Sequence, residues 1–359
     1  MFLPVKLFSK SPELSKPPGS TKPVSEKPAD DSELIWKKEL ANATTSVVDL
    51  LERLELGHYI KIADIRPDFK CLVTENYISK MQAGNINDPL LQQVLPLNQE
   101  NHSKIQYHGL TDPVGDINAL VSPGLLHKYH GRVLLISTGA CAIHCRYCFR
   151  RCYPYQQFSY SNKVMNETLD YLKTHTEIEE IILSGGDPLT LDNEKLAALI
   201  STLENIKHIQ TLRIHTRLPV VLPSRINTGL LHILQSSRFQ PVMVIHTNHA
   251  NELGSAEYSK LHLLHKAGIT LLNQSVLIKG VNDNVDTLTA LSKRLFQCKT
   301  LPYYLHLLDP VKGAMHFNVS NKNALHLKSQ IEQQLPGYLV PRLVQDIAEN
   351  KAKTAISRI

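Results

Sequence analysis

From Arg132 onward, short apolar runs alternate with longer segments in which apolar residues recur at helical spacing. The runs predict strands at residues 132–138, 179–185, 211–216, 241–247, 270–278 and 302–309. The longer segments predict helices near residues 162–175, 194–206, 227–238, 255–268, 284–298 and 321–335. Strict alternation of strand and helix predicts right-handed βαβ units built around a parallel sheet.

The chain before Arg132 has a different pattern. Residues 1–31 contain six prolines with several Ser and Lys, a composition that predicts a disordered tail. The segments IWKKELANA and TTSVVDLLERLEL indicate two short helices, the second capped near Thr45. We therefore divide the chain into the tail, a mostly helical N-terminal region (32–120), a strand–helix region (121–320) and a C-terminal segment (321–359).

Composition narrows the class of protein. Hydrophobic residues make up 42% of the chain and charged residues 20%, as in soluble globular proteins. The sequence has neither an apolar run of about 18 residues, the length of a membrane span, nor an apolar start long enough for a secretory signal. Three of the six cysteines lie in one loop, which fits a reducing compartment better than a disulfide framework. These features predict a cytoplasmic enzyme.

The net charge of +6 does not predict a nucleic-acid-binding protein. Nucleic-acid binding needs Lys and Arg concentrated in a stripe with stacking aromatic side chains, whereas the cations here are spread along the chain. A solvated basic surface is the simpler interpretation. Attraction to an acidic protein partner is the alternative.

Cys141, Cys145 and Cys148 follow the first predicted strand in the loop CAIHCRYC. This C-x3-C-x2-C spacing presents three thiolates to one iron–sulfur cluster and leaves the fourth iron without a protein ligand. The spacing resembles that of the radical S-adenosylmethionine superfamily, in which the cofactor chelates the open iron and is cleaved to a 5′-deoxyadenosyl radical. We therefore expect these cysteines to hold a [4Fe–4S] cluster.

The residues alone leave other roles open for these cysteines. A structural zinc site needs four ligands, and His144 or Cys152 could supply the fourth. Cys152 could also be a fourth cluster ligand, and buried structural cysteines are a further interpretation. Three arginines crowd the loop and favour the cluster, because cations suit thiolates and an anionic substrate better than a passive zinc site. They are Arg146, Arg150 and Arg151.

Polar motifs stand at the ends of the predicted strands. The cysteine loop follows the first strand, GGDPL the second, HTR the third, HTNH the fourth and HLLD the sixth. Barrel enzymes gather their sites at the carboxyl ends of the strands, so these motifs should meet in one cavity. Six βα units with this arrangement predict an α/β fold, the incomplete (β/α)6 barrel of the superfamily, preceded by an N-terminal helical extension.

Two of these strand ends suggest contacts with S-adenosylmethionine. The second strand ends in a run whose free main-chain groups could hold the methionine part, formed by Ser184, Gly185, Gly186 and Asp187. His246 and Gln274 lie on later strands, where they could hydrogen-bond the ribose or adenine. The plainer interpretation of the glycine run is a simple turn, and that of His246 is a core histidine whose hydrogen bonds are satisfied within the protein.

A narrower resemblance covers roughly residues 33–355. The stretches that carry it are GLLHKYHGRVLLISTGACAIHCRYCFRR, ILSGGDPL, HTRLPVVLPSRI, NQSVLIKGVND and PYYLHLLDPVKGAMHF. They closely resemble the lysine 2,3-aminomutases, which use a [4Fe–4S] cluster, S-adenosylmethionine and pyridoxal 5′-phosphate together. In that family an imine with the substrate's α-amino group allows a radical at Cβ to move the nitrogen.

The resemblance implies a lysine that holds pyridoxal phosphate, seven residues after an acidic position. Asp346 and Lys353 reproduce that interval, although AENKA replaces the family's glycine-rich approach and leaves Lys351 as a competitor. Tyr129 and Arg132 match the family's phosphate contacts. The plainer interpretation of Lys353 is a solvated C-terminal lysine. That of Arg132 is an arginine that only forms a salt bridge at the start of a strand.

The resemblance also implies which residues bind the substrate. Arg150 matches the arginine that binds the substrate carboxylate. Asp309 and Asp346 match the two carboxylates that bind the distal ammonium of lysine. Because buried carboxylates without a partner are costly, enclosure of both would support a cationic ligand.

Two departures from the longer, lysine-fermenting enzymes narrow the prediction further. The chain ends six residues after Lys353, and Asn284 stands where that group has a zinc cysteine. The shorter form resembles the enzyme that makes (R)-β-lysine for modification of translation elongation factor P, which links it to that factor and its lysine ligase. A free-lysine, glutamate or arginine 2,3-aminomutase and a non-catalytic iron–sulfur or zinc module are the alternatives. The oligomeric state stays open, a homo-oligomer included.

Overall fold

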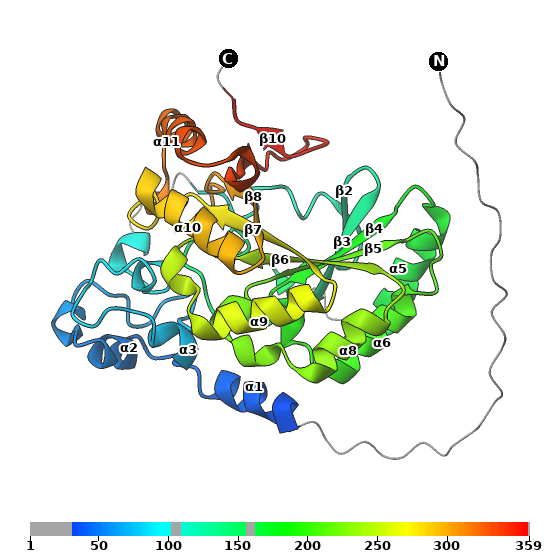
Figure 1. Cartoon of the computed structure of the whole chain (residues 1–359), viewed down its shortest axis with the longest axis horizontal. Coiled ribbons are helices and arrows are strands. Elements are labelled where there is room, and N and C mark those ends of the chain that lie inside the picture. The colour runs from blue at the N-terminus through cyan, green and yellow to red at the C-terminus, as the bar shows by residue number, and fades with distance from the viewer. Residues whose placement is uncertain (1–30, 102–108, 156–161, 358–359) are drawn as a thin grey trace, which may run out of the picture. The chain divides into compact units, whose positions relative to one another are not determined.

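The computed structural model describes residues 31–101, 109–155 and 162–357. The predicted tail at residues 1–31 lies outside these ranges, apart from Asp31, which begins the first helix. Figure 1 shows a central sheet with helices along one side and the short N-terminal helices at one end. Among the described residues, no helix is long and apolar enough to cross a membrane.

The sheet contains ten strands whose spatial order follows the sequence. All neighbours from β3 to β9 are parallel, whereas the β1–β2, β2–β3 and β9–β10 pairs are antiparallel. The strands are β1 (Leu120–Ser122), β2 (Leu125–Tyr129), β3 (Arg132–Thr138), β4 (Glu180–Gly185), β5 (Thr211–Thr216), β6 (Gln240–His246), β7 (Thr270–Val276), β8 (Leu301–His306), β9 (Arg342–Gln345) and β10 (Thr354–Ala355). Strands β3 to β8 form the predicted incomplete barrel.

A helix follows each barrel strand and covers the outer face of the sheet (Figure 1). These helices are α5 (Asn162–Thr174), α6 (Asn193–Leu203), α8 (Thr228–Ser236), α9 (Ser255–Lys266), α10 (Val285–Gln297) and α11 (Asn321–Gln334). Polar N-caps begin several of them, since Asp192, Asn227 and Ser320 each accept a hydrogen bond from a backbone N–H of the first turn. The α/β barrel with its N-terminal helices agrees with the sequence prediction.

The core lies between the strands and the helices. On β5, Leu212 and Ile214 are buried in the hydrophobic core, while Arg213 and His215 face the inside of the barrel. This alternation follows from the period of two along a strand. It places apolar residues in the outer layer and leaves the inner face free for polar chemistry.

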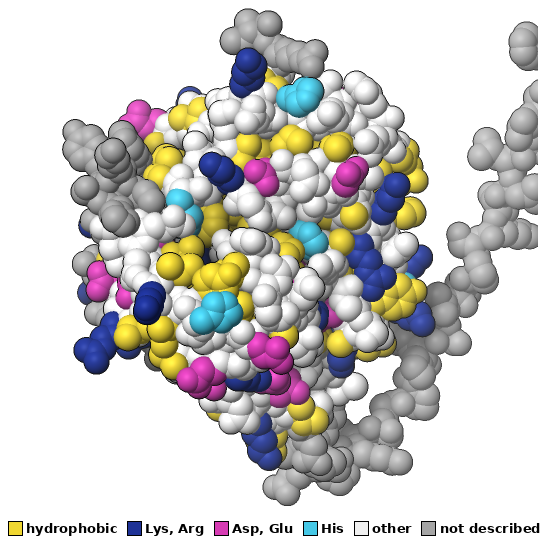
Figure 2. All heavy atoms as spheres, turned by 90° about the vertical axis from the view of Figure 1, so that its left-hand side faces the viewer, with side chains coloured by type: hydrophobic (Ala, Val, Ile, Leu, Met, Phe, Trp, Pro, Cys, Tyr) yellow, Lys and Arg dark blue, Asp and Glu magenta, His cyan; other side chains and the backbone are white. Residues whose placement is uncertain are grey.

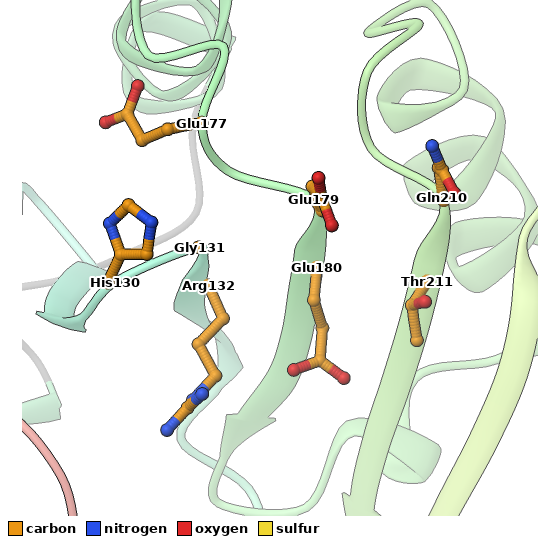
Figure 3. A pocket seen from close by; sticks show the side chains of 8 residues that line it. All are labelled: His130, Gly131, Arg132, Glu177, Glu179, Glu180, Gln210 and Thr211. Carbon is orange, nitrogen blue, oxygen red and sulfur yellow. The ribbon is translucent and has the colours of Figure 1, made fainter.

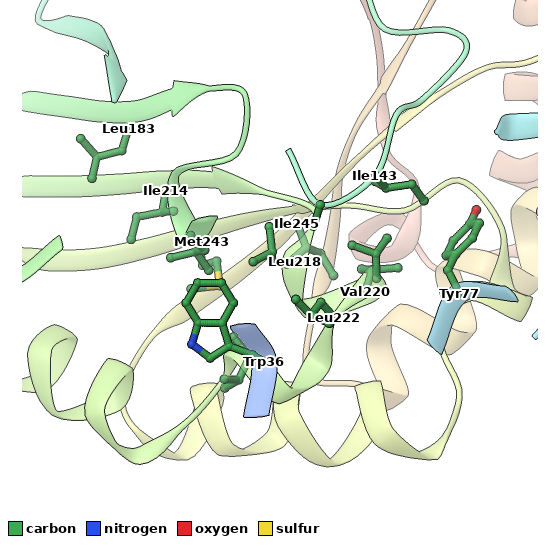
Figure 4. Close-up of a cluster of buried hydrophobic side chains, with 14 of the residues drawn as sticks. Trp36, Tyr77, Ile143, Leu183, Ile214, Leu218, Val220, Leu222, Met243 and Ile245 are labelled. Atoms are coloured by element: carbon green, nitrogen blue, oxygen red, sulfur yellow. The ribbon is translucent and has the colours of Figure 1, made fainter. Parts of the chain in front are cut away.

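The N-terminal helices close the outer layer. They are α1 (Asp31–Ala41), α2 (Val47–Arg53) and the single turn α3 (Glu75–Ile78). Trp36 on α1 is only 2% exposed and lies beside Met243 of β6 in the cluster drawn in Figure 4. The guanidinium of Arg225 stacks over its ring at 4.9 Å. Apolar burial thus fixes the N-terminal region to the barrel.

Several predicted boundaries differ from the structure. The cap of α2 is Ser46 rather than Thr45, because the Ser46 hydroxyl accepts from the backbone N–H of Asp49. Strand β8 ends at His306 instead of residue 309. The sequence also failed to indicate β1, β2, β9 and β10, which are short and lie in segments without clear periodicity.

Charged side chains of both signs are interspersed over the face shown in Figure 2. Lysines and arginines lie next to acidic residues and hydrophobic side chains, without gathering into a stripe on this face. This arrangement is that of an ordinary solvated surface.

Candidate functional site

One cavity of about 650 Å³ occupies the inside of the barrel. Its wall combines the cysteine loop after β3, the turn after β4, the inner faces of β5 to β8 and the hairpin formed by β9 and β10. All the site residues predicted from the sequence line it. Cys152 does not appear in its lining and is exposed at the surface.

Cys141, Cys145 and Cys148 face this cavity together. Burial raises the pKa of Cys148 to about 11, and the neighbouring Cys145 thiol adds to the effect. Burial and the nearby Cys148 also raise the pKa of Cys141. A nearby cationic centre would favour the thiolate forms of Cys141 and Cys148, and an iron–sulfur cluster supplies such a centre.

The N-terminal region holds the cysteine loop from outside the barrel. The backbone N–H of His144 donates to the Leu72 carbonyl at 3.0 Å, and that of Arg146 donates to the Gln93 carbonyl at 2.8 Å. The cysteine loop therefore takes its shape from backbone contacts with residues about 50 to 70 positions earlier in the chain.

Glu100 adds a buried ionic anchor to this loop. Its carboxylate accepts from Arg146 Nε at 2.9 Å and from Arg151 Nη2 at 2.8 Å. Burial alone would raise the pKa of Glu100, but the hydrogen bonds and charges of the two arginines lower it. Arg146 and Arg151 therefore hold the loop in place, whereas the sequence suggested them as neighbours of thiolates.

The turn after β4 binds the cysteine loop from the inside. The backbone N–H of Gly186 donates to the Thr138 carbonyl, and that of Asp187 donates to the Ala140 carbonyl, both at 2.7 Å. A Cβ on Gly186 would lie 2.1 Å from the Ala140 oxygen, so only glycine permits this approach. These two amides, predicted to be free for the cofactor, are already occupied.

The Asp187 side chain is also occupied by internal partners. Its carboxylate accepts from the Thr216 hydroxyl at 2.7 Å and from the Arg217 backbone N–H at 2.6 Å. Burial raises its pKa to about 6 despite these donors. Asp187 thus joins the end of β4 to the end of β5. Gly185 lines the cavity as well and has a φ of +122°.

His246 and Gln274 face the cavity from neighbouring strands, as predicted. Their Nε2 atoms lie 3.1 Å apart. The structure adds His215 of β5 and His306 of β8, whose Nε2 atoms are buried without a hydrogen-bond partner among the described residues. Burial lowers the pKa of all three histidines, to about 4 for His246, so their rings are neutral at pH 7. The alternation of inward-facing and outward-facing positions along β5 and β8 could have indicated His215 and His306 as cavity residues.

Arg150 reaches the cavity from the cysteine loop. Its Nη1 donates to Ser184 Oγ at 3.0 Å, and its Nε donates to Asp116 Oδ2 at 2.7 Å. Lys128 pairs with the other oxygen of Asp116 at 2.5 Å. The buried carboxylate of Asp116 therefore orients two cations. Sequence reasoning missed it, because residues 57–130 gave no pattern that set it apart.

The hairpin of β9 and β10 explains the seven-residue interval between Asp346 and Lys353. Asp346 directly follows β9 and Lys353 directly precedes β10, so the hairpin brings the two side chains together. Lys353 Nζ lies 2.8 Å from Asp346 Oδ2, and the Tyr129 hydroxyl donates to Asp346 Oδ1 at 2.7 Å. Lys351 is exposed and lies outside the cavity lining.

Asp309 is a buried carboxyl group beside this hairpin. Its Oδ1 has no hydrogen-bond partner among the described residues. Burial, together with the charge of Asp346, raises its pKa to about 7. An enclosed carboxylate without a partner is costly, and a cationic ligand would remove the cost.

Arg132 belongs to a basic part of the same cavity, together with Arg213 and Arg342. Arg132 stacks over the Tyr129 ring at 4.8 Å. Tyr303 donates to the Tyr304 hydroxyl at 2.8 Å in the same wall. Three cations and two hydroxyl groups form an environment suited to an anion. The sequence indicated Tyr129 and Arg132 but not Arg213, Arg342 or the tyrosine pair.

A second depression lies at the amino ends of β3 to β5 (Figure 3). Arg132 and Glu180 extend in the same direction from paired positions of neighbouring strands, and Glu177 and His130 lie at the rim. Glu180 is already paired with Arg213. The cysteines line only the first cavity, which is therefore the candidate active site.

Residues 135–291 match the Radical SAM superfamily, and together with the cysteine loop in a partial barrel they define a radical S-adenosylmethionine enzyme. The chain is 44% identical over 332 residues to an L-lysine 2,3-aminomutase from Haemophilus influenzae, covering 92% of this chain and 97% of the relative. The corresponding enzyme from Buchnera aphidicola is 42% identical over 328 residues, covering 90% and 95%. An Escherichia coli relative of the same name is 41% identical over 324 residues, covering 89% and 94%. The chain belongs to the L-lysine 2,3-aminomutase family.

Family membership makes the protein an isomerase and implies three cofactors: a [4Fe–4S] cluster, S-adenosylmethionine and pyridoxal 5′-phosphate. The family predicted from the motifs is thus confirmed.

Replacing Glu100 by Ala should lower the free energy of unfolding by about 3–5 kcal/mol, because two buried guanidinium groups lose their carboxylate. Glu75→Ala, which breaks an exposed pair with Arg53, is the matched control and should cost at most about 1 kcal/mol. Anaerobic chemical denaturation measures both. Equal losses in the two variants would contradict the anchoring role of Glu100.

Proposed function

We propose that this protein converts L-lysine to (R)-β-lysine with a radical made from S-adenosylmethionine. The observation that carries the proposal is one enclosed cavity that joins three cysteines, a lysine in a hairpin and an unpartnered buried carboxyl group. Anaerobic incubation with the cofactors and several amino acids, followed by analysis of product chirality, tests it. A better turnover of glutamate or arginine than of lysine would contradict it.

In this proposal, Cys141, Cys145 and Cys148 hold the cluster. The fit rests on their shared cavity and on the cations around them. When bound, the reduced cluster supplies the electron that cleaves S-adenosylmethionine. The chain's own contribution is the rigid shape of the loop, held by the N-terminal region on one side and by the turn after β4 on the other.

We assign S-adenosylmethionine to the part of the cavity beside the cysteine loop. His246 and Gln274 would bind its ribose or adenine, and Ser184 and Gly185 would line its methionine part. Gly186 and Asp187 act indirectly, since their amides are bonded to the cysteine loop. The neutral rings of the cavity histidines add hydrogen-bonding groups without adding charge.

Pyridoxal phosphate would occupy the basic part of the cavity. Lys353 would hold it covalently, and Tyr129 and Arg132 would bind its phosphate with help from Arg213 and Arg342. The fit rests on the cations and hydroxyl groups gathered there and on the partly enclosed Lys353 amine. Pyridoxal phosphate, when bound to the substrate nitrogen, supplies the π system that lets the nitrogen migrate.

The substrate lysine would lie between these two parts. Arg150, oriented by Asp116, would bind its carboxylate, while Asp309 and Asp346 would bind its ε-ammonium. A glutamate side chain would instead place a third carboxylate beside these two, which is unfavourable in a low-dielectric cavity. The same pair of aspartates would therefore select for a cationic side chain.

We further propose that the product serves modification of elongation factor P, through the ligase that attaches it to a lysine of that factor. Asn284 supports this assignment, because its side chain caps α10 by accepting from the Thr287 N–H at 2.9 Å. The position where fermenting enzymes carry a zinc cysteine thus has a different, local role here.

Alanine in place of Cys141, Cys145 or Cys148 should abolish the absorption at about 400 nm that such clusters show, because each thiolate holds one iron. Cys152→Ala, at an exposed position outside the cavity, should retain it. Absorption spectra and iron and sulfide content after anaerobic isolation measure both effects. Loss of the cluster in Cys152→Ala would contradict an open iron.

Borohydride reduction of the protein loaded with pyridoxal phosphate should place the adduct on Lys353, whose amine is enclosed beside Asp346. Lys353→Ala should lose the adduct, and Lys351→Ala should keep it, since Lys351 is exposed. Peptide mapping by mass spectrometry locates the modified residue. An adduct on Lys351 in the native protein would overturn the assignment.

Turnover of L-lysine should depend on ionisation of Asp309. Its pKa is raised to about 7, so the carboxyl is neutral below that pH and binds an ammonium poorly. The kcat/KM for lysine should rise with pH through about 7. Asp309→Asn should remove this step and lower turnover by at least about a hundredfold, because the ε-ammonium would lose one of its two carboxylate partners and breaking a buried ion pair costs about 3–5 kcal/mol.

Asp283→Asn, at a surface turn, is the control for Asp309→Asn and should behave as the native enzyme. Iron and pyridoxal phosphate contents should be unchanged in both variants. Near-native lysine turnover in Asp309→Asn would remove the basis of the specificity assignment.

Deleting the gene should leave elongation factor P unmodified or carrying α-lysine, because the ligase would lack (R)-β-lysine. Mass spectrometry of the factor from the deletion and parent strains measures the difference. An identical mass in both strains, with a defect in lysine catabolism in the deletion strain, would assign the enzyme to free-lysine metabolism instead.

A further inference from the structure

Arg217 is a buried arginine whose guanidinium lies against the cysteine loop. It directly follows β5 and is 5% exposed. Its Nη1 donates to Cys145 Sγ at 2.6 Å. Its backbone N–H is bonded to Asp187, which fixes the start of the side chain to the turn after β4. The contact with sulfur is therefore built into the fold.

Three further partners hold the other end of the guanidinium. Arg217 Nη2 donates to Glu252 Oε2 at 2.8 Å, to Gln93 Oε1 at 2.9 Å and to the Tyr77 hydroxyl at 3.1 Å. Tyr77 and Gln93 belong to the N-terminal region, and Glu252 belongs to the short helix after β6. Together they fix the plane of the group so that Nη1 faces the sulfur.

A cation that donates a hydrogen bond to a cluster thiolate has a definite electrostatic effect. Reduction adds a negative charge to the cluster, and hydrogen bonds to its sulfurs and nearby charges set its potential. The effect is stronger for a buried cation than for one at the surface, and Arg217 is buried. The opposite charge of Glu252 reduces the effect, since it lies on the far side of the same guanidinium.

We propose that Arg217 is a positioning residue of the cluster, whose hydrogen bond to Cys145 raises the reduction potential, and that Glu252 sets the size of this effect. The proposal rests on the proposed ligation by Cys145. It gives the N-terminal region a part in the chemistry, because Tyr77 and Gln93 orient the group that tunes the iron–sulfur centre.

A purely structural role for Arg217 makes a different prediction, and the chain offers a matched control. Arg225 is likewise fully buried, but it donates to the backbone carbonyls of Leu189 and Leu191 rather than to sulfur. If burial alone mattered, replacing either arginine would have the same effect. If Arg217 tunes the cluster, replacing Arg217 should lower the reduction potential and replacing Arg225 should leave it unchanged. Replacing Glu252 should raise it.

The experiment is an anaerobic redox titration of the reconstituted cluster, followed by electron paramagnetic resonance, in Arg217→Gln, Glu252→Gln and Arg225→Gln. Arg217→Gln should lower the ratio of reduced to oxidised cluster about tenfold at a fixed potential, a shift of about 59 mV to lower potential. Glu252→Gln, which keeps the oxygen that accepts from the Asn248 and His249 N–H groups, should shift it upward. Arg225→Gln should leave it unchanged.

Glu252→Gln decides the outcome even if Arg217→Gln fails to retain iron. An unchanged or lower potential in Glu252→Gln, or equal shifts in the two arginine variants, overturns the proposal. Cys145→Ala is measured alongside. A cluster that persists in this variant removes Cys145 as a ligand, and so separates failure of the proposed ligation from failure of the tuning role.

Discussion

The cysteine loop depends on backbone hydrogen bonds that come from two distant parts of the chain. The loop itself has no regular secondary structure, so its own sequence does not fix where the three sulfur atoms lie. Gly186 and Asp187 hold it from inside the barrel, and Leu72 and Gln93 hold it from outside. The site is therefore a product of tertiary structure, and the N-terminal region is as much a part of it as the barrel.

Buried charge in and around the barrel is arranged in compensated groups. Asp116 lies between Arg150 and Lys128, Glu100 binds two arginines of the loop, and Asp346 lies between Lys353 and Tyr129. Each arrangement satisfies a buried or partly buried carboxylate that would otherwise be costly. Asp309 is the exception among these, with an oxygen that has no partner in the described structure.

The barrel and its cysteine loop could be predicted from the sequence because strand–helix alternation and motif spacing are local signals. The ranges 132–138 and 211–216 agree with β3 and β5 to the residue. Asp116, Arg213 and Arg342 could not be found in this way. Their roles depend on long-range neighbours, and a lone charged residue in an unpatterned segment or at a strand position has the same local appearance whether it faces solvent or a cavity.

The hairpin that pairs Lys353 with Asp346 has a consequence for the resting state of the enzyme. On the proposed function, Asp346 receives the ammonium of the substrate, yet without ligands it already holds an ammonium of the same kind from its own chain. The protein's lysine thus occupies the place of the substrate's lysine until it is drawn away to the cofactor. Once Lys353 is bound to the cofactor, Asp346 would keep the hydrogen bond from the Tyr129 hydroxyl, and the ammonium of an arriving substrate would restore the ion pair that Lys353 had given up.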